Sequence, residues 1–238
     1  TRLVPPEAVF GWAPDDPPSR GGWRGADGAP AGGGAPGRFV IECSTLSRPW
    51  VLELAKQAAT QGFRYIDSPV TGLPTAAAAG ELRLLIGAAP ADLDAVRPLL
   101  EPLCGSIVHF GEVGAGTAYK LVQNLLGSVQ IAATAEALRI AELSGLDLPA
   151  VVDTLALSVA ASPTVTRVSR LMLDGVHDRD IAFTAALRLK DTRIGMELAE
   201  AVHAPAALGH AAFDLFGRLV EAGHGELNET KVIDLLRE

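Results

Sequence analysis

Hydrophobic positions recur along the chain in two different patterns. The change of pattern divides the chain into a region of alternating strands and helices and a region of helices alone. Short apolar runs bounded by Gly, Pro or polar residues predict strands over 39–43, 64–67, 82–86 and 107–110. Helical patterns lie between them. One follows Ser47, a candidate N-cap with Pro49 in the first turn, and another spans 90–103. Strands that alternate with helices predict an α/β sheet domain over residues 39–115.

After Gly116 the strand signals stop. Apolar residues then recur with helical spacing, which predicts helices over 117–144, 149–159, 163–173, 184–202 and 205–222. We place the boundary near residues 114–116. The expected fold class is α/β plus all-α. It comprises a partial Rossmann-like sheet domain and then an all-helical dimerisation domain over residues 116–238.

Residues 1–38 differ in composition from the rest of the chain. They contain nine Gly and seven Pro, and they show neither helical nor strand periodicity. This composition is typical of an irregular, flexible arm. The alternation of Gly, Ala, Pro and Arg also resembles GC-rich coding sequence read out of frame.

Charge and composition narrow the classes of function. The net charge is −8 and no Lys/Arg cluster is present, which argues against nucleic-acid binding. No apolar stretch approaches the roughly 20 residues of a membrane span. Cys43 and Cys104 form no CxxC pair and the five His are scattered, so we expect no disulfide framework, no metal and a cytoplasmic location. The expected partner is a small molecule or another subunit.

Lys120 and Asn124 are the most informative polar pair. They are four positions apart, so they share one face of the long predicted helix. The next positions on that face, Gly127 and Ser128, are small and leave room for a ligand. An exposed lysine near a helix start is the alternative, and taken alone it is the commoner one. The chain has only four Lys against 16 Arg, however, and lysine alone of the two can lose its proton in a desolvated site.

Two further polar segments follow predicted strands. Thr71 and Gly72 lie in a Pro/Gly turn, where backbone N–H groups and the Thr71 hydroxyl can converge on a carboxylate. An ordinary strand-ending turn is the alternative. Ser44 and Thr45 come at the end of a predicted strand, the edge at which open parallel sheets bind ligands. Helix capping is the alternative for this pair.

In this order the segments resemble the motifs of the β-hydroxyacid dehydrogenases, which include enzymes similar to 3-hydroxyisobutyrate dehydrogenase and 6-phosphogluconate dehydrogenase. The resemblance runs from about residue 38 to the C-terminus. Any one motif is modest, and the order and spacing of all five make the resemblance specific. The matching segments are Phe39-Val40-Ile41-Glu42-Cys43-Ser44-Thr45, Asp67-Ser68-Pro69-Val70-Thr71-Gly72, the run from Gly114 through Lys120 to Asn124, Lys190-Asp191, and Gly223-His224-Gly225-Glu226-Leu227-Asn228.

The resemblance implies hydride transfer between NAD or NADP and a small β-hydroxy acid or semialdehyde. On the matching positions, it implies that Lys120 gives and takes the proton at the reacting carbon–oxygen bond. Asn124 is implied to orient both the substrate and that lysine. Lys190 is implied to lie near the cofactor, where its charge would help lower the pKa of Lys120. Taken alone, Lys190-Asp191 is typical of a solvated helix face, because adjacent side chains on a helix diverge.

Four further positions receive binding roles from the same resemblance. Thr71 and Gly72 are implied to hold the substrate carboxylate. Ser44 or Thr45 is implied to approach the nicotinamide ribose. Leu73 stands where the family has its second loop glycine, which narrows the substrate pocket or changes its shape.

The family's N-terminal βαβ unit carries Gly-x-Gly-x-x-Gly, and this chain has no such fingerprint. Two hypotheses follow. The first is a working NAD(P)-dependent dehydrogenase whose phosphate site comes from elsewhere. The second is a truncated, cofactor-poor pseudoenzyme or binding protein that keeps the helical domain. An imine reductase ranks third, because those enzymes usually lack a lysine at the position of Lys120. We expect a homodimer in the first two cases.

Overall fold

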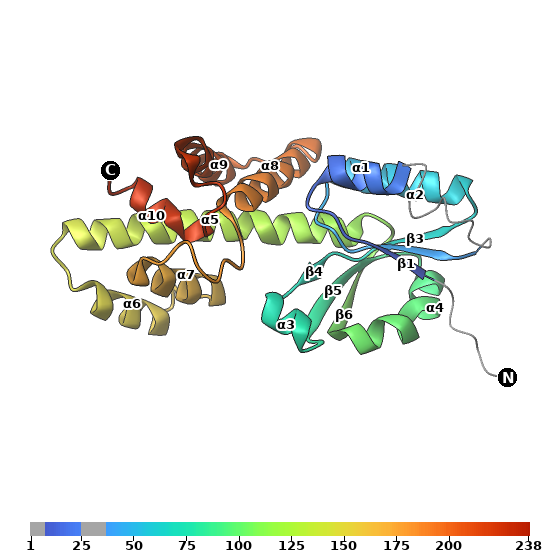
Figure 1. Ribbon diagram of the computed structural model, residues 1–238, viewed down its shortest axis with the longest axis horizontal. Helices are drawn as coiled ribbons and strands as arrows, with labels where there is room; N and C mark the ends of the chain where they lie inside the picture. Colours follow the sequence, from blue (N-terminus) through green and yellow to red (C-terminus); the bar gives the residue numbers. More distant parts are fainter. Residues whose placement is uncertain (1–7, 25–36) are drawn as a thin grey trace. The chain divides into compact units, whose positions relative to one another are not determined.

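The computed structural model describes residues 8–24 and 37–238. The chain divides into two compact units, one running to Val122 and the other spanning Gln123–Glu238. In Figure 1 the strands belong to the first unit, which we call the sheet unit. The second, which we call the helical unit, is built from helices.

The described part of the sheet unit forms a six-stranded sheet. Its strand order is β1-β2-β3-β5-β4, and β6 pairs with β5. β1, β2 and β3 are mutually parallel, as are β5 and β6, whereas β5 runs antiparallel to β3 and β4. The strands are β1 (Ala8–Gly11), β2 (Phe39–Glu42), β3 (Arg64–Asp67), β4 (Val70–Thr71), β5 (Leu82–Gly87) and β6 (Cys104–Gly111).

Helices cover this sheet, and their ends follow the local sequence. α2 (Arg48–Thr60) begins at Ser47, whose side chain accepts from the amide of Trp50, so the expected N-cap is confirmed. Two clusters of buried apolar side chains pack around the strands. One contains Ile41 and Ile66, and the other contains Trp50. The other helical segments are α3 (Pro74–Ala78), α4 (Pro90–Leu100) and a 3-10 turn over Glu101–Leu103.

The structure differs from the sequence expectation within residues 1–38. β1 pairs in parallel with β2, placing Ala8 beside Phe39, and α1 (Asp16–Arg24) follows it. The physical reason is tertiary contact. The Trp23 side chain is buried, and its Nε1 donates to Glu42 Oε2 at 2.7 Å. Such contacts override the poor helix propensity of the Pro and Gly residues in α1. Residues 1–7 and 25–36 of this segment lie outside the described residues.

The helical unit confirms the expected helical region, which follows the sheet. α5 (Ala115–Leu143) is continuous, and Asp147, Ser162 and Thr184 each cap the helix that follows them by accepting an amide hydrogen. A buried cluster containing Ile131 forms the core. The remaining helices are α6 (Leu148–Leu157), α7 (Pro163–Asp174), α8 (Ala185–Ala201), α9 (Ala207–Leu219) and α10 (Val232–Leu235), with a π-helical turn over Val220–His224 and a 3-10 turn over Glu229–Lys231.

The division between the units falls further along the chain than the glycine-rich boundary we expected. α5 starts at Ala115, but its residues up to Val122 cluster with the sheet unit. The first turn of α5 lies directly against β5, since a Cβ on Gly116 would overlap the carbonyl oxygen of Leu85. The start of this helix is therefore part of the sheet unit.

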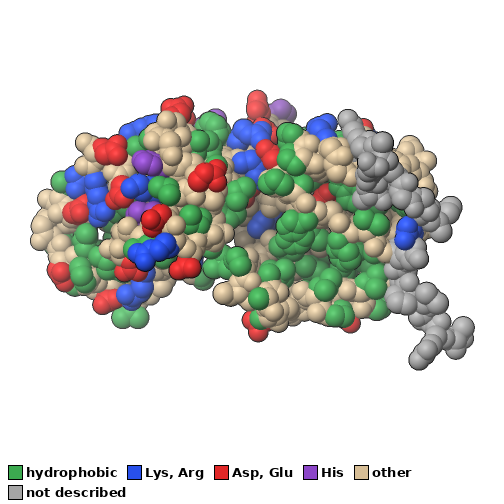
Figure 2. Space-filling model, in the orientation of Figure 1, with side chains coloured by type: hydrophobic (Ala, Val, Ile, Leu, Met, Phe, Trp, Pro, Cys, Tyr) green, Lys and Arg blue, Asp and Glu red, His purple; other side chains and the backbone are tan. Residues whose placement is uncertain are grey.

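The visible face of the helical unit carries charges of both signs. Figure 2 shows basic and acidic side chains interspersed over it. Among residues 8–24 and 37–238, no helix is both long enough and apolar enough to cross a bilayer.

Candidate active site

The carboxyl end of β2 carries Ser44 and Thr45, and the structure separates their roles. Ser44 is buried, and both its amide and its hydroxyl donate to Glu42 Oε1, at 3.0 and 2.5 Å. Its hydroxyl oxygen also accepts from the amide of Ala13 at 2.6 Å. Ser44 therefore ties the segment after β1 to β2. Thr45 is partly exposed, which makes it the better placed of the two to meet a ligand.

The contacts around α1 were missed by the sequence interpretation. The carboxylate of Asp16 accepts from the amide and hydroxyl of Ser47, at 2.9 and 2.5 Å, and Trp50 Nε1 donates to Ser19 Oγ at 3.0 Å. Asp16 followed by two prolines is a helix-start signal that would have revealed α1. These contacts fix the segment that connects β1 to α1 at the carboxyl edge of the parallel strands.

The loop expected to bind a carboxylate lies between β3 and α3. Thr71 is half-buried and pairs with Arg83 across β4 and β5. Gly72 is exposed and has φ +136°, a conformation that other residues rarely adopt. Leu73 is 42% exposed, so it is available to line a substrate pocket. The structure leaves both Thr71 and Gly72 accessible, as a binding loop requires.

The start of α5 is held by Asp67, the last residue of β3. Asp67 Oδ1 accepts from the amide of Gly114 at 2.6 Å, and Oδ2 accepts from the amide of Thr117 at 2.7 Å. Burial raises the pKa of Asp67, while these two hydrogen bonds oppose the shift. Lys120 follows on the same helix and is half-buried.

A second polar cluster lies between α5 and α8 in the helical unit. Asn124 Nδ2 donates to Asp191 Oδ2 at 2.5 Å, and Lys190 Nζ lies 2.8 Å from Asp191 Oδ1. Asp191 is 2% exposed, so the Lys190-Asp191 pair is not the solvated helix face that its sequence alone suggests. The structure thus brings Asn124 and Lys190 together through a carboxylate.

An ion-pair network centred on Glu229 contacts this cluster through Arg188. Glu229 is fully buried and accepts from Arg188 Nε and Arg167 Nη2, each at 2.7 Å. Arg188 also donates to the backbone oxygen of Asn124 at 3.3 Å, and its guanidinium lies over the ring of Phe183. Sequence patterns gave no sign of this network, because its members lie far apart along the chain.

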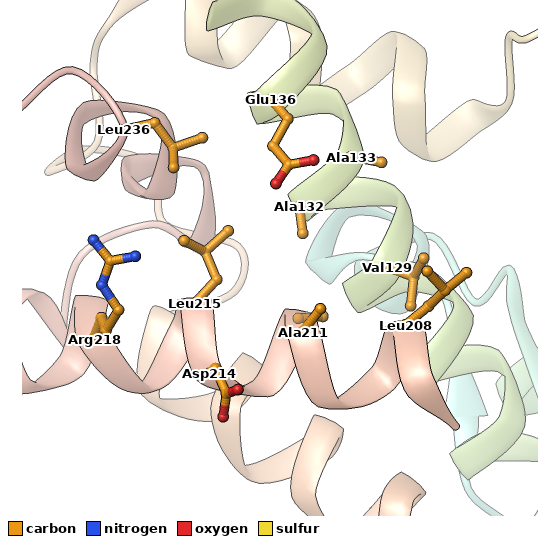
Figure 3. Close-up of a pocket in the computed structure, with 11 residues that line it drawn as sticks. Val129, Ala132, Ala133, Glu136, Leu208, Ala211, Asp214, Leu215, Arg218 and Leu236 are labelled. Carbon is orange, nitrogen blue, oxygen red and sulfur yellow. The ribbon is translucent and has the colours of Figure 1, made fainter. Parts of the chain in front are cut away.

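The structure contains a groove that none of the expected site residues lines. It lies between α5 and α9, has a volume of about 320 Å³ and is shown in Figure 3. Its lining is mostly apolar and also includes Glu136, Asp214 and Arg218. Among the described residues, no group of three or more His, Cys, Asp or Glu side chains is arranged to hold a metal ion.

Comparisons with known proteins match nearly the whole described chain. Residues 114–236 match the family model described as NAD-binding of NADP-dependent 3-hydroxyisobutyrate dehydrogenase. Residues 7–111 match the model for the NAD binding domain of 6-phosphogluconate dehydrogenase. The second match includes β1 and α1, the elements that the sequence patterns did not predict.

Individual proteins give the same result. A probable 3-hydroxyisobutyrate dehydrogenase of Mycobacterium tuberculosis is 33% identical over 207 residues, which cover 85% of this chain and 70% of the relative. A solved structure of 3-hydroxyisobutyrate dehydrogenase from Mycobacterium tuberculosis with L-serine superposes with a TM-score of 0.83 at 30% identity, covering 97% of this chain and 79% of that one. The structure of a 3-hydroxyisobutyrate dehydrogenase from Salmonella typhimurium gives a TM-score of 0.86 at 25% identity, with 96% and 79% covered.

Proposed function

The chain belongs to the family of β-hydroxyacid dehydrogenases, and from this premise we propose that it oxidises a small β-hydroxy acid to its semialdehyde, or catalyses the reverse reduction. The observation that carries the proposal is the placement of Lys120 and Asn124 at helical spacing on the continuous helix α5, with Asn124 anchored on Asp191. The cofactor is NAD or NADP.

The sheet unit fits a nicotinamide cofactor. β1, β2 and β3 are parallel, and their carboxyl ends lie along one edge of the sheet, where α/β folds bind nucleotides. The half-exposed Thr45 extends from this edge, and we assign it the contact with the cofactor ribose in preference to the buried Ser44. We also assign Lys190 a contact with the cofactor, as the family resemblance implies. When bound, the nicotinamide accepts or supplies the hydride.

The protein's own contribution is to hold the substrate and move one proton. Thr71 and Gly72 bind the substrate carboxylate with a hydroxyl and backbone amides. Asn124 orients the hydroxyl-bearing carbon. In the oxidation, the C–H hydride leaves for the cofactor and the hydroxyl proton passes to the neutral amine of Lys120, giving the aldehyde and the lysine ammonium. The reduction returns the same proton to the new hydroxyl.

Cofactor binding and turnover test this function. The protein is titrated with NADH and NADPH while cofactor fluorescence is followed, and initial rates are measured with 3-hydroxyisobutyrate and L-serine, which the names of similar proteins suggest. Binding and turnover are expected. If neither cofactor binds at concentrations up to millimolar, the proposed dehydrogenase activity is contradicted and the alternative, a binding protein, is favoured.

The role of Lys120 is tested in the same assay. Lys120→Ala is expected to lower turnover by a factor on the order of 10²–10⁴, the usual scale of acid–base catalysis. Lys56→Ala is the matched control, because Lys56 is an exposed lysine on α2 that carries no proposed role. Turnover that survives in Lys120→Ala would show that another group moves the proton.

We further propose a homodimer, as expected from the long amphipathic helix. Exposed apolar side chains on the helical unit support it: Ile140 is 65% exposed, Leu143 70% and Leu208 69%. Light scattering on the purified protein is expected to give the mass of two chains. A cytoplasmic location is proposed from the two free thiols, Cys43 and Cys104.

A further inference from the structure

One buried carboxylate joins the end of a strand to the start of the helix that carries Lys120. Asp67 is 1% exposed, and each of its two oxygens accepts one amide hydrogen at the start of α5, from Gly114 directly before the helix and from Thr117 in its first turn. Amides at the start of a helix have no partners within the helix, so they need acceptors from outside. Here the acceptor comes from β3, 47 residues before the first of these amides.

Two glycines allow the strand and the helix to approach this closely. A Cβ on Gly87 would overlap the Asp67 carboxylate, and a Cβ on Gly116 would overlap the carbonyl oxygen of Leu85. The first turn of α5 therefore rests on the backbone of β5. Contact between two backbones leaves no flexible side chain to absorb a displacement, so the helix start has little room to shift against β5.

The same carboxylate also marks the start of the loop proposed to bind substrate. Ser68 follows Asp67 directly, its amide donates to the oxygen of Glu42 at 2.7 Å, and the loop continues to Thr71. Lys120 lies four positions after Gly116, hence on the same face of α5. Asp67 is thus bonded to the helix that carries the amine and directly precedes the loop that carries Thr71.

We propose that Asp67 is a positioning residue for the reaction: its doubly accepting carboxylate fixes the start of α5, and with it Lys120, relative to the loop that carries Thr71. The inference rests on the proposed function, since it assigns Asp67 a role in that same site. Because Asp67 is buried, it acts through the helix and not on the substrate. A misplacement of a reacting group by about 1 Å costs on the order of 10²-fold in rate.

Asp67→Asn tests this role with little change of shape. The amide side chain offers one accepting oxygen and places an NH₂ group against the second amide, so the helix start loses one hydrogen bond and meets a donor instead. Asp147→Asn is the matched control. Asp147 also caps a helix, accepting from the amide of Ala150 at 3.3 Å, but α6 carries none of the proposed site residues.

A kcat-against-KM comparison separates positioning from general stability. With enzyme concentration normalised by cofactor titration, Asp67→Asn is expected to lower kcat on the order of 10²-fold, while KM and the cofactor Kd stay within about twofold. Asp147→Asn is expected to keep the wild-type kcat. Wild-type kcat in Asp67→Asn, or an equal loss in both variants, would overturn the proposal.

Hydrogen exchange keeps the inference testable if Asp67→Asn does not fold. In the wild-type protein, NMR is expected to show the amides of Gly114 and Thr117 protected from exchange. Exchange at the rate of exposed loop amides would overturn the proposal. A wild-type protein that shows this protection but turns over no β-hydroxy acid would instead contradict the proposed function, so the two failures are distinguishable.

Discussion

The amide of Asn124 is hydrogen-bonded to the carboxylate of Asp191, with 2.5 Å between Nδ2 and Oδ2. An ionised carboxylate only accepts, so it fixes which end of the amide faces it and directs the Asn124 oxygen elsewhere. The ammonium of Lys190 contacts the other carboxylate oxygen. Asp191 therefore sets the orientation of an amide proposed to bind substrate.

Replacing Asp191 by Asn is expected to lower kcat/KM about tenfold or more, because the Asn124 amide is then free to turn over. It should also destabilise the protein by about 3 kcal/mol, since a buried ion pair loses one partner. Steady-state kinetics and urea unfolding measure the two effects. Glu197→Gln is the control on the same helix, where an exposed pair with Arg193 is broken. Equal effects in both variants would contradict the role of Asp191.

Glu229→Gln is expected to cost about 3–5 kcal/mol of unfolding free energy. The fully buried carboxylate is contacted by both Arg167 and Arg188, and its neutralisation leaves those guanidinium groups without their counter-charge there. Urea denaturation measures the loss. Asp153→Asn breaks the exposed pair with Arg170 and should cost less than about 1 kcal/mol. A small loss in Glu229→Gln would show that the network contributes little.

Stability is expected to fall between neutral and mildly acidic pH because of His177. Burial is the main cause that lowers the pKa of His177 below its usual 6.5, against the opposing effect of Asp234. The unfolded chain therefore binds the proton more readily, so stability is complete above pH 6.5 and is lost as the pH falls from there towards the lowered pKa. Thermal melting from pH 8 to 5 measures how the melting temperature changes with pH, and His177→Gln should weaken this dependence. If the variant keeps the same dependence, other titrating groups cause it.

The Cys43 thiol is expected to be unreactive in the native protein. Burial, with a contribution from Glu42, raises its pKa to about 12, so almost no thiolate forms near neutral pH. Cys104 also has a raised pKa, mainly through desolvation. Iodoacetamide labelling followed by mass spectrometry is expected to modify Cys43 only after denaturation. Rapid labelling of the folded protein would contradict the burial.

Much of the fold was predictable because the elements agree with their local sequence. The strands at Phe39–Glu42 and Arg64–Asp67 are short apolar runs with clear boundaries, and α5 is a long helical pattern. α1 was not predictable by the same rules, because it contains Pro and Gly and depends on contacts such as the one between Trp23 and Glu42. Local propensity carries no information about such distant partners.

The candidate site was predictable where a motif is local. Lys120 and Asn124 share a helix face, so their spacing alone relates them. The roles of Asp67 and Glu229 were not predictable, since each acts on amides or guanidinium groups dozens of residues away. Ser44 shows a further limit: its hydrogen bonds to Glu42 and Ala13 join segments that no local pattern relates, so the sequence could not reveal them.

The close contact between Gly116 and β5 has a consequence for protein engineering. Every missense change of this codon adds at least a methyl group where the Leu85 oxygen already lies. Random libraries aimed at new substrates are therefore expected to lose stability in clones altered at this position. Leu73 is the better position to randomise, because its exposed side chain can be changed without disturbing the packing of the sheet unit.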